Sequence, residues 1–458
     1  MTAVKRRRSG NIYSATYWTR ESRETHDGLP VGRRHMREQI MASSVRYPTS
    51  SLPPPAERPS FDAFFSYGFR PFFLGAAVYA VLAMLLWLGW IASVALGWPQ
   101  GWLLVAGSPF AWHAHEIVFG FATAAIGGFL LTAVPNWTGA LPLSGFPLVV
   151  LFAVWLLGRV AMGLSAVVPY PLVMIADGAF LPLLGGFAAL QLFTRPAARN
   201  LVFLAMIVAM MICNIVSHLG NAGYLDVDPM AAIRAAMLIV IVMIAVIGGR
   251  IIPAFTHNWL NGQRPPVPMP RRIRWLDMTA LVSLVVFVLF DTLAAGWVLV
   301  GTAALVAAIA NGGRLVLWRG FATHAEPIVW VLHLGYAWIV IGLLLAALSA
   351  FTNEIPPAVV SHAFGTGAIG TMILAVMSRA SLGHTGRRLV APRVIVATYH
   401  LVTLAALLRV IAPLLPAQSY SPMLLAAGLA WAASFLLFAL VYAPILTTPR
   451  VHMKLASR

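Results

Sequence analysis

Two histidines and a glutamate lie within four residues, at His113, His115 and Glu116, where a long apolar stretch begins. Imidazole is a natural ligand for haem iron and copper, and a carboxylate can complete a metal site. Ionisable side chains are costly at the edge of a bilayer, so this group indicates a function. Because an α-helix turns by about 100° per residue, we expect His113 and Glu116 on one face and His115 roughly opposite. The two histidines are therefore not expected to bind one small ion together.

Two pairs of histidines are candidates to hold a haem between facing helices, one histidine on each side of the iron. His113 and His362 each begin a helix that carries the same glycine motif, and both are expected at the outer face of the membrane. His333 and His400 lie about two turns inside their helices, toward the inner face. We predict that His113 and His362 bind the haem, with His333 and His400 as the alternative pair.

A second, outer metal site is predicted from His115, Glu116 and His218. Arg250 lies within an apolar span, where a charge needs a partner, and we predict that it contacts the cofactor. For Arg159 in the third span, the expected partner is Glu116, Asp177 or a haem carboxylate. A structural alternative applies to each residue, because helix-end histidines can bind water or lipid headgroups and buried arginines can form ion pairs.

The composition is that of a membrane protein. Of 458 residues, 60% are hydrophobic and only 10% are charged, against about 25% charged residues in soluble domains. The net charge of +17 does not indicate nucleic-acid binding, because the basic residues lie in the amino-terminal tail and in alternate loops. The single cysteine, Cys213, excludes a disulfide framework and a thiolate cluster.

Hydrophobic runs of spanning length follow one another through the chain and predict about twelve transmembrane helices. Residues 1–59 are predicted to be a disordered basic cytosolic tail, 60–448 the transmembrane domain, and 449–458 a short basic cytosolic tail. The predicted spans are 72–96, 112–134, 146–168, 171–193, 200–220, 231–252, 276–293, 296–317, 327–349, 358–380, 394–414 and 422–445.

Charges in the loops set the expected orientation. Loops on the side of the amino-terminal tail contain most of the arginines, whereas acidic residues gather in the opposite loops. Since cytoplasmic loops are enriched in Lys and Arg, both termini are predicted to be cytosolic. Those opposite loops contain Asp226, Asp228, Asp291 and Glu354, with Arg234 and Arg409 as the basic residues near that side.

A glycine motif recurs along the chain. Ile126-Gly127-Gly128 returns as Ile247-Gly248-Gly249 and, less closely, as Ile369-Gly370-Thr371, in predicted helices two, six and ten. This spacing predicts three repeats of four helices each. Small residues of this kind let helices approach closely, and internal repeats are common in transporters, so the repeat does not select a function.

Five blocks of sequence stand in order along the chain: FRPFFLGA (69–76), WHAHEIVFGFATAAIGGFLLTAVPNWTG (112–139), GGRIIPAFTHNW (248–259), VLHLGYAW (331–338) and HAFGTGAIGTMILAVMSRASLGHTGR (362–387). Together they resemble the signature of the NnrS family of bacterial membrane proteins. The resemblance implies a cytoplasmic (inner) membrane protein with haem, which we expect to be of b type, and also with copper. It further implies a link to denitrification and to resistance to nitric oxide, with nitric oxide or iron-nitrosyl species as partners beside the lipid bilayer.

The chain also resembles, more distantly, the catalytic subunit of haem-copper oxidases, which has twelve helices in a pseudo-threefold plan. There, histidines of helices two and ten hold a haem, which matches His113 and His362 in helix number and side. Helices six and seven of this chain lack the histidines that would hold the oxidase copper ion. The resemblance therefore does not predict reduction of oxygen or nitric oxide by the oxidase mechanism.

The sequence contains no nucleophile triad, nucleotide-binding loop or cysteine-rich metal motif, so no catalytic residue is assigned. We interpret the chain as a haem-binding and copper-binding membrane protein of the nitric oxide response. The main alternative is a transporter of metal ions or small solutes that uses the histidines as a relay. A third hypothesis is a membrane scaffold in which the histidines only pack.

Overall fold

The computed structural model describes residues 58–194, 197–263 and 267–451. All regular structure in this part of the chain is helical, and twelve helices are long and apolar enough to cross a membrane. The predicted all-helical, multi-pass fold is thereby confirmed. The predicted tail at 1–59 lies almost wholly outside the described residues, as does most of the tail at 449–458, and both remain predictions.

The spans agree with the hydropathy prediction to within a few residues at most ends, including the break after Thr292. The sixth span is the exception, because its helix continues to Leu260 instead of ending near residue 252. The helices are α1 (Phe61–Phe64), α2 (Phe69–Ala95), α3 (Pro109–His115), η1 (Glu116–Ala122), α4 (Thr123–Thr138), α5 (Phe146–Gly163), α6 (Tyr170–Gly178), α7 (Phe180–Leu192), α8 (Ala198–Asn221), α9 (Pro229–Leu260), α10 (Arg274–Thr292), α11 (Trp297–Leu317), η2 (Gly320–Thr323), α12 (Pro327–Thr352), α13 (Pro357–His362), η3 (Ala363–Gly370), α14 (Thr371–His384), α15 (Arg393–Ile411), η4 (Ala412–Leu414) and α16 (Ala417–Thr447).

Helix boundaries follow local chemistry. Several spans begin with proline in the first turn, where its missing N–H is not needed, as at Pro229 and Pro357. At the start of α9 the side chain of Asp228 accepts a hydrogen bond of 2.9 Å from the N–H of Met230. Helix α4 ends at Gly139, whose φ of 71° is the left-handed conformation that glycine adopts most easily.

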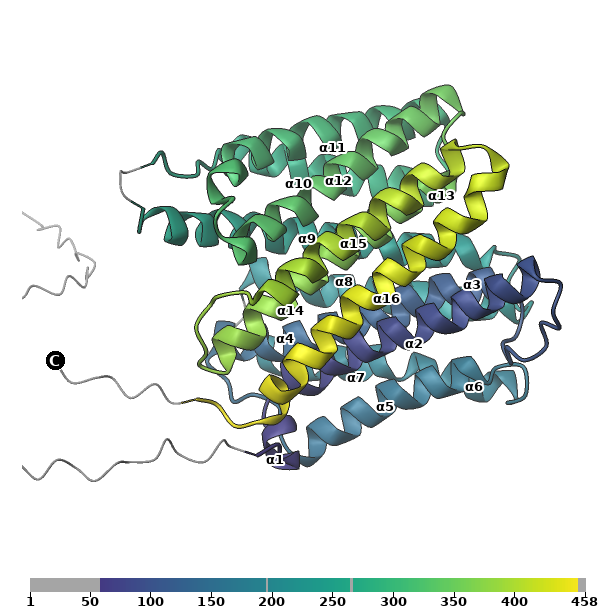
Figure 1. The fold of residues 1–458 in the computed structure, drawn as a ribbon, viewed down its shortest axis with the longest axis horizontal. Helices are drawn as coiled ribbons and strands as arrows, with labels where there is room; N and C mark the ends of the chain where they lie inside the picture. The colour runs from purple at the N-terminus through teal and green to yellow at the C-terminus, as the bar shows by residue number, and fades with distance from the viewer. Residues whose placement is uncertain (1–57, 195–196, 264–266, 452–458) are drawn as a thin grey trace, which may run out of the picture. The chain divides into compact units, whose positions relative to one another are not determined.

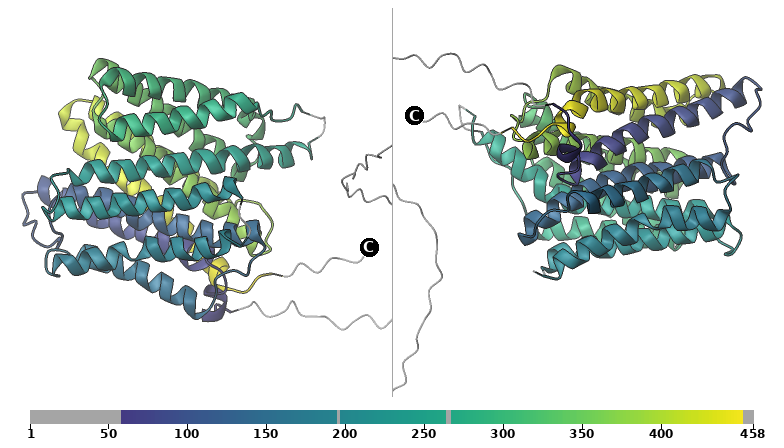
Figure 2. Two further views of the ribbon diagram at one scale, coloured as in Figure 1. Left: turned by 180° about the vertical axis from the view of Figure 1, so that it is seen from behind. Right: turned by 90° about the horizontal axis from the view of Figure 1, so that it is seen from below.

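The second, sixth and tenth spans are the most buried of the twelve. The helices run side by side (Figures 1 and 2), with α2 packed against α4 and α16, and α12 against α11 and α14. Glycine permits the closest approaches: a Cβ atom added to Gly128 would lie 2.7 Å from the ring of Phe73, and one on Gly370 would overlap the ring of Trp431. Small residues thus bring the central helices against their neighbours.

Spans two and ten share an unusual local architecture. Each begins with a short α-helix (α3, α13), continues through a π-helical segment (η1, η3) and ends in a longer α-helix (α4, α14). The sixth span is one continuous α-helix, α9. π-Helical segments widen the turn and occur frequently at functional sites. Both segments follow directly after predicted ligands, at the end that carries α3 and α13, called below the His113 end. The threefold repeat itself remains a prediction.

Candidate functional site

A buried ion-pair network joins the second, third and fourth spans. Arg159 of α5 donates a hydrogen bond of 2.7 Å from Nη1 to Oε2 of Glu116 in η1. The other terminal nitrogen, Nη2, donates to Oδ1 of Asp177 in α6. Both carboxylates are fully buried, and the guanidinium group is nearly so. Two acids and one arginine have a net charge of −1, so the network needs one further cation.

Two histidines lie where this cation is needed. Oδ2 of Asp177 is 2.9 Å from Nε2 of His218 and 3.3 Å from Nε2 of His115. Asn214 bridges the group, donating from Nδ2 to Asp177 at 2.8 Å and placing Oδ1 3.0 Å from His115 Nε2. One ligand atom from each of His115, Asp177 and His218 lies within 4.8 Å of the other two. That spacing approaches the separation of ligands around one ion with bonds of about 2.1 Å.

His115 is held in an orientation suited to metal binding. Its Nδ1 lies 3.0 Å from Oε1 of Glu116, while Nε2 faces the oxygens of Asn214 and Asp177. A ring with acceptors on both sides carries a proton on each nitrogen. A metal ion at Nε2 would replace one of these protons and supply positive charge in its place. Glu116 then acts as the carboxylate that orients a ligating histidine, a common arrangement around metal ions.

The expected arrangement of this helix agrees with its contacts. His113 and Glu116 both contact α2: the ring of His113 stacks on Trp87, with 4.5 Å between ring centroids and 13° between planes, and Glu116 accepts a hydrogen bond from Tyr79. His115 faces Asn214 and Asp177 instead, and only its Nδ1 reaches back to Glu116. Among the described residues, the cluster with metal-ligand spacing contains Asp177 in place of Glu116.

Tyrosines extend the network at both ends. Tyr79 of α2 donates its hydroxyl hydrogen to Oε2 of Glu116. The Tyr170 hydroxyl lies 3.1 Å from Nδ1 of His218 and accepts a bond of 2.8 Å from Asn221. His218 therefore has partners on both ring nitrogens, like His115. Both histidines and Tyr170 also line a small pocket.

The structure brings His113 and His362 into one region at the His113 end. The two rings and the guanidinium group of Arg409 in α15 lie within the range of electrostatic interaction of one another. Helix α13 packs against α15, which explains how Arg409 reaches the pair. Nδ1 of His362 donates to the carbonyl of Ala358 at 2.7 Å, so Nε2 carries the free lone pair. Nδ1 of His113 is buried without a hydrogen-bond partner.

Arg409 is a buried cation with unused donors. Its side chain forms no ion pair with any described residue, and its buried Nε and Nη1 atoms have no hydrogen-bond partner. The ring of Tyr420 lies 6.0 Å from its Cζ atom. A buried guanidinium group with free donors suits an anionic ligand, above all a carboxylate.

The remaining predicted residues lie apart from these groups. His333 is buried, with Nε2 2.8 Å from the hydroxyl of Thr256. His400 is exposed, and its ring lies 5.7 Å from that of Trp330. The guanidinium group of Arg250 lies over the ring of Phe203, 5.5 Å from its centroid. His333 and His400 thus have different neighbours and different exposure.

Three residues of these groups were not assigned to the predicted sites from the sequence. Asp177 was expected only as a partner of Arg159, Arg409 only as a basic residue near the outer face, and Asn214 not at all. An acid within an apolar span is a strong signal, because such residues are rare and need partners. That signal could have found Asp177. Asn214 lies one turn before His218 on α8, a spacing that puts both on one face.

Comparison with known proteins identifies the family of this chain. A search of curated proteins finds no match. The family model described as NnrS protein matches residues 63–450, from before the first span to just beyond the last. The match includes every residue of the two histidine sites and all twelve spans. The chain therefore belongs to the NnrS family.

Proposed function

We propose that this chain binds haem through His113 and His362, binds a transition-metal ion at a second site, and acts in the cellular response to nitric oxide. The observation that carries the proposal is the grouping of these two histidines with Arg409 at one end of the bundle. Histidines on two facing helices are a common means of holding haem iron. Nitric oxide enters the proposal through the family.

The residues present fit a haem. His362 donates from Nδ1 to a backbone carbonyl, which fixes the tautomer that leaves Nε2 available to iron. Arg409 offers unused donors to the haem carboxylates, and Trp87 holds the ring of His113 by stacking. Bound haem would supply reversible binding of small gases and exchange of single electrons. A b-type haem is consistent with the sequence, because the only cysteine is Cys213.

The second site fits copper or another divalent transition metal. Imidazole is a good ligand for copper, zinc and iron, and the carboxylate of Asp177 completes a set of two nitrogens and one oxygen. Glu116 orients His115 through Nδ1, and Tyr170 does the same for His218. Arg159 neutralises part of the acidic charge, so the site retains the −1 that a cation requires.

The location proposed for this activity is the bacterial cytoplasmic membrane, with both termini in the cytosol. The support is the excess of arginine in loops on the side of the termini. In this orientation His113, His362 and Arg409 lie at the outer face. Nitric oxide or an iron-nitrosyl species would then reach the haem from the periplasm or from the bilayer.

A visible spectrum of the purified protein, oxidised and dithionite-reduced, tests the haem. We expect a reduced α-band at about one haem per chain, absent from His113→Ala and His362→Ala. The control is His400→Ala, an exposed histidine, which should retain the band. A band that survives both ligand substitutions would refute the assignment of His113 and His362, and lack of any Soret band after expression with ample haem would refute haem binding.

The transporter alternative depends on the pocket beside His115 and His218. Reconstituted vesicles loaded with a fluorescent metal indicator distinguish the two functions. A binding protein should retain about one metal ion per chain without accumulation in the vesicle lumen. Uptake that requires His218 would favour transport.

A further inference from the structure

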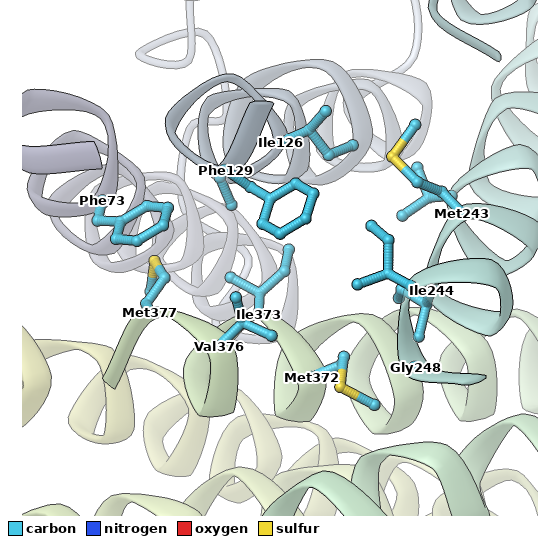
Figure 3. Close-up of a pocket in the computed structure, with 13 residues that line it drawn as sticks. Phe73, Ile126, Phe129, Met243, Ile244, Gly248, Met372, Ile373, Val376 and Met377 are labelled. Atoms are coloured by element: carbon cyan, nitrogen blue, oxygen red, sulfur yellow. The ribbon is translucent and has the colours of Figure 1, made fainter. Parts of the chain in front are cut away.

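An apolar cavity lies where the second, sixth and tenth spans meet. It is lined by α2, α4, α9 and α14, and Figure 3 shows the side chains of Phe73, Ile126, Met243, Ile244 and Ile373 around it. The cavity has a volume of about 60 Å³, which is larger than the volume that a single water molecule requires. Its lining contains no polar side chain, so water would lose its hydrogen bonds there.

The cavity lies near the middle of the membrane. Ile126, Ile244 and Ile373 are each close to the midpoint of the spans that contain them. Three residues of the lining, Phe129, Ile247 and Val376, are only half-buried. The cavity therefore reaches toward the surface of the bundle at the depth of the lipid tails.

The glycines of the repeated motif pack against aromatic rings of neighbouring helices. A Cβ atom added to Gly128 would overlap the ring of Phe73, one on Gly370 that of Trp431, and one on Gly248 would lie 3.1 Å from the ring of Tyr336. Large side chains therefore occupy the space beside these glycines, whereas the space between Ile126, Ile244 and Ile373 stays open. Packed helices leave few spaces larger than a water molecule, so a cavity of this volume beside the three most buried spans needs an explanation.

We propose that this cavity binds a small, neutral, apolar solute of the size of a diatomic gas, taken up from the hydrocarbon layer. The apolar lining excludes ions and hydrogen-bonding solutes, and the volume excludes large ones. The methionine thioethers of Met243 and Met372 add polarisable contacts that favour such a solute. Identification of the solute as nitric oxide rests on the proposed function, whereas the binding itself does not.

Xenon is the probe, because it enters apolar cavities of protein interiors and scatters anomalously. Crystals of the full chain pressurised with xenon should show one anomalous peak between Ile126, Ile244 and Ile373. The peak should disappear in Val376→Phe, whose ring would fill the cavity. It should remain in Val282→Phe, the same substitution on α10 at a position that is 54% exposed.

A second variant, Ile373→Ala, keeps the test valid if Val376→Phe does not fold. It enlarges the cavity and should raise xenon occupancy at least twofold. Lack of a peak in the wild-type protein and in Ile373→Ala would overturn the proposal. An ordered lipid chain filling the cavity would overturn it as well. Because xenon binding does not require haem, a protein that lacks the haem band but binds xenon would refute the proposed function alone.

Discussion

Replacing Arg159 with methionine should destabilise the protein strongly. Methionine keeps much of the length and the apolar stem of arginine but removes both ionic contacts. The carboxylates of Glu116 and Asp177 would remain fully buried, each without its arginine partner. Removing one partner of a buried ion pair typically costs about 3–5 kcal/mol, because the remaining charge is uncompensated. Since His115 and Tyr79 still bind Glu116, we expect about 3 kcal/mol, the low end of that range.

The measurement is the free energy of unfolding in mixed micelles, followed by tryptophan fluorescence. Arg272→Met is the matched control: its side chain is 54% exposed, and its partner Asp277 keeps a second ion pair with Arg314. Exposed pairs contribute about 0–1 kcal/mol, so this variant should be almost neutral. The triple variant Glu116→Gln, Arg159→Met, Asp177→Asn removes all three charges together and should recover most of the lost stability. Equal stabilities for Arg159→Met and Arg272→Met would refute the argument that burial makes the Arg159 network costly to break.

Three further predictions concern other contacts. Tyr170→Phe removes the hydroxyl that binds a metal-site histidine and should weaken metal affinity by about tenfold in a competition titration; unchanged affinity would contradict the orienting role. Gly128→Ala should cost about 1–3 kcal/mol of unfolding free energy, because its Cβ would lie 2.7 Å from Phe73. Gly186→Ala, with open space around its Cβ, is the control and should not destabilise. Burial raises the pKa of Glu326; the folded state then binds this proton more tightly than the unfolded state, so stability relative to Glu326→Gln should increase as pH falls through the folded pKa. Parallel stability curves for these two proteins would refute that effect.

The sequence predicted the spans well because hydropathy and length are local properties. The break between Thr292 and Trp297 and the start of α12 at Pro327 both follow from local residues. The π-helical segments could not be predicted in this way, since their sequences, such as EIVFGFA in η1, have no pattern that distinguishes them from an α-helix. The end of α9 was also missed, because hydropathy locates the apolar run and not the last residue of the helix, which is Leu260.

Membrane topology indicated which predicted site residues share an end of the bundle, and packing decides which of them meet. His115 and His218 were predicted at the same end, on different spans, and the structure brings their rings together. The third member, Asp177, depends on how α6 packs against α8, which spacing along the chain does not determine. For the same reason the sequence did not place Arg409 beside His362, because that proximity depends on the packing of α13 against α15.

The placement of His113 and His115 on one helix leads to a last prediction, that the two sites are independent. His113 faces Trp87 and the region of Arg409, whereas His115 faces Asp177 and Asn214. No described hydrogen bond or ion pair joins the two groups, and sites without shared partners usually respond additively to substitution. His115→Ala should therefore abolish metal binding and leave the haem band, while His113→Ala should do the opposite. Metal analysis and the reduced spectrum of the same samples measure both effects. Loss of the haem band in His115→Ala, with the protein still folded, would show that one cofactor needs the other and would contradict the separation of the sites by the body of the helix.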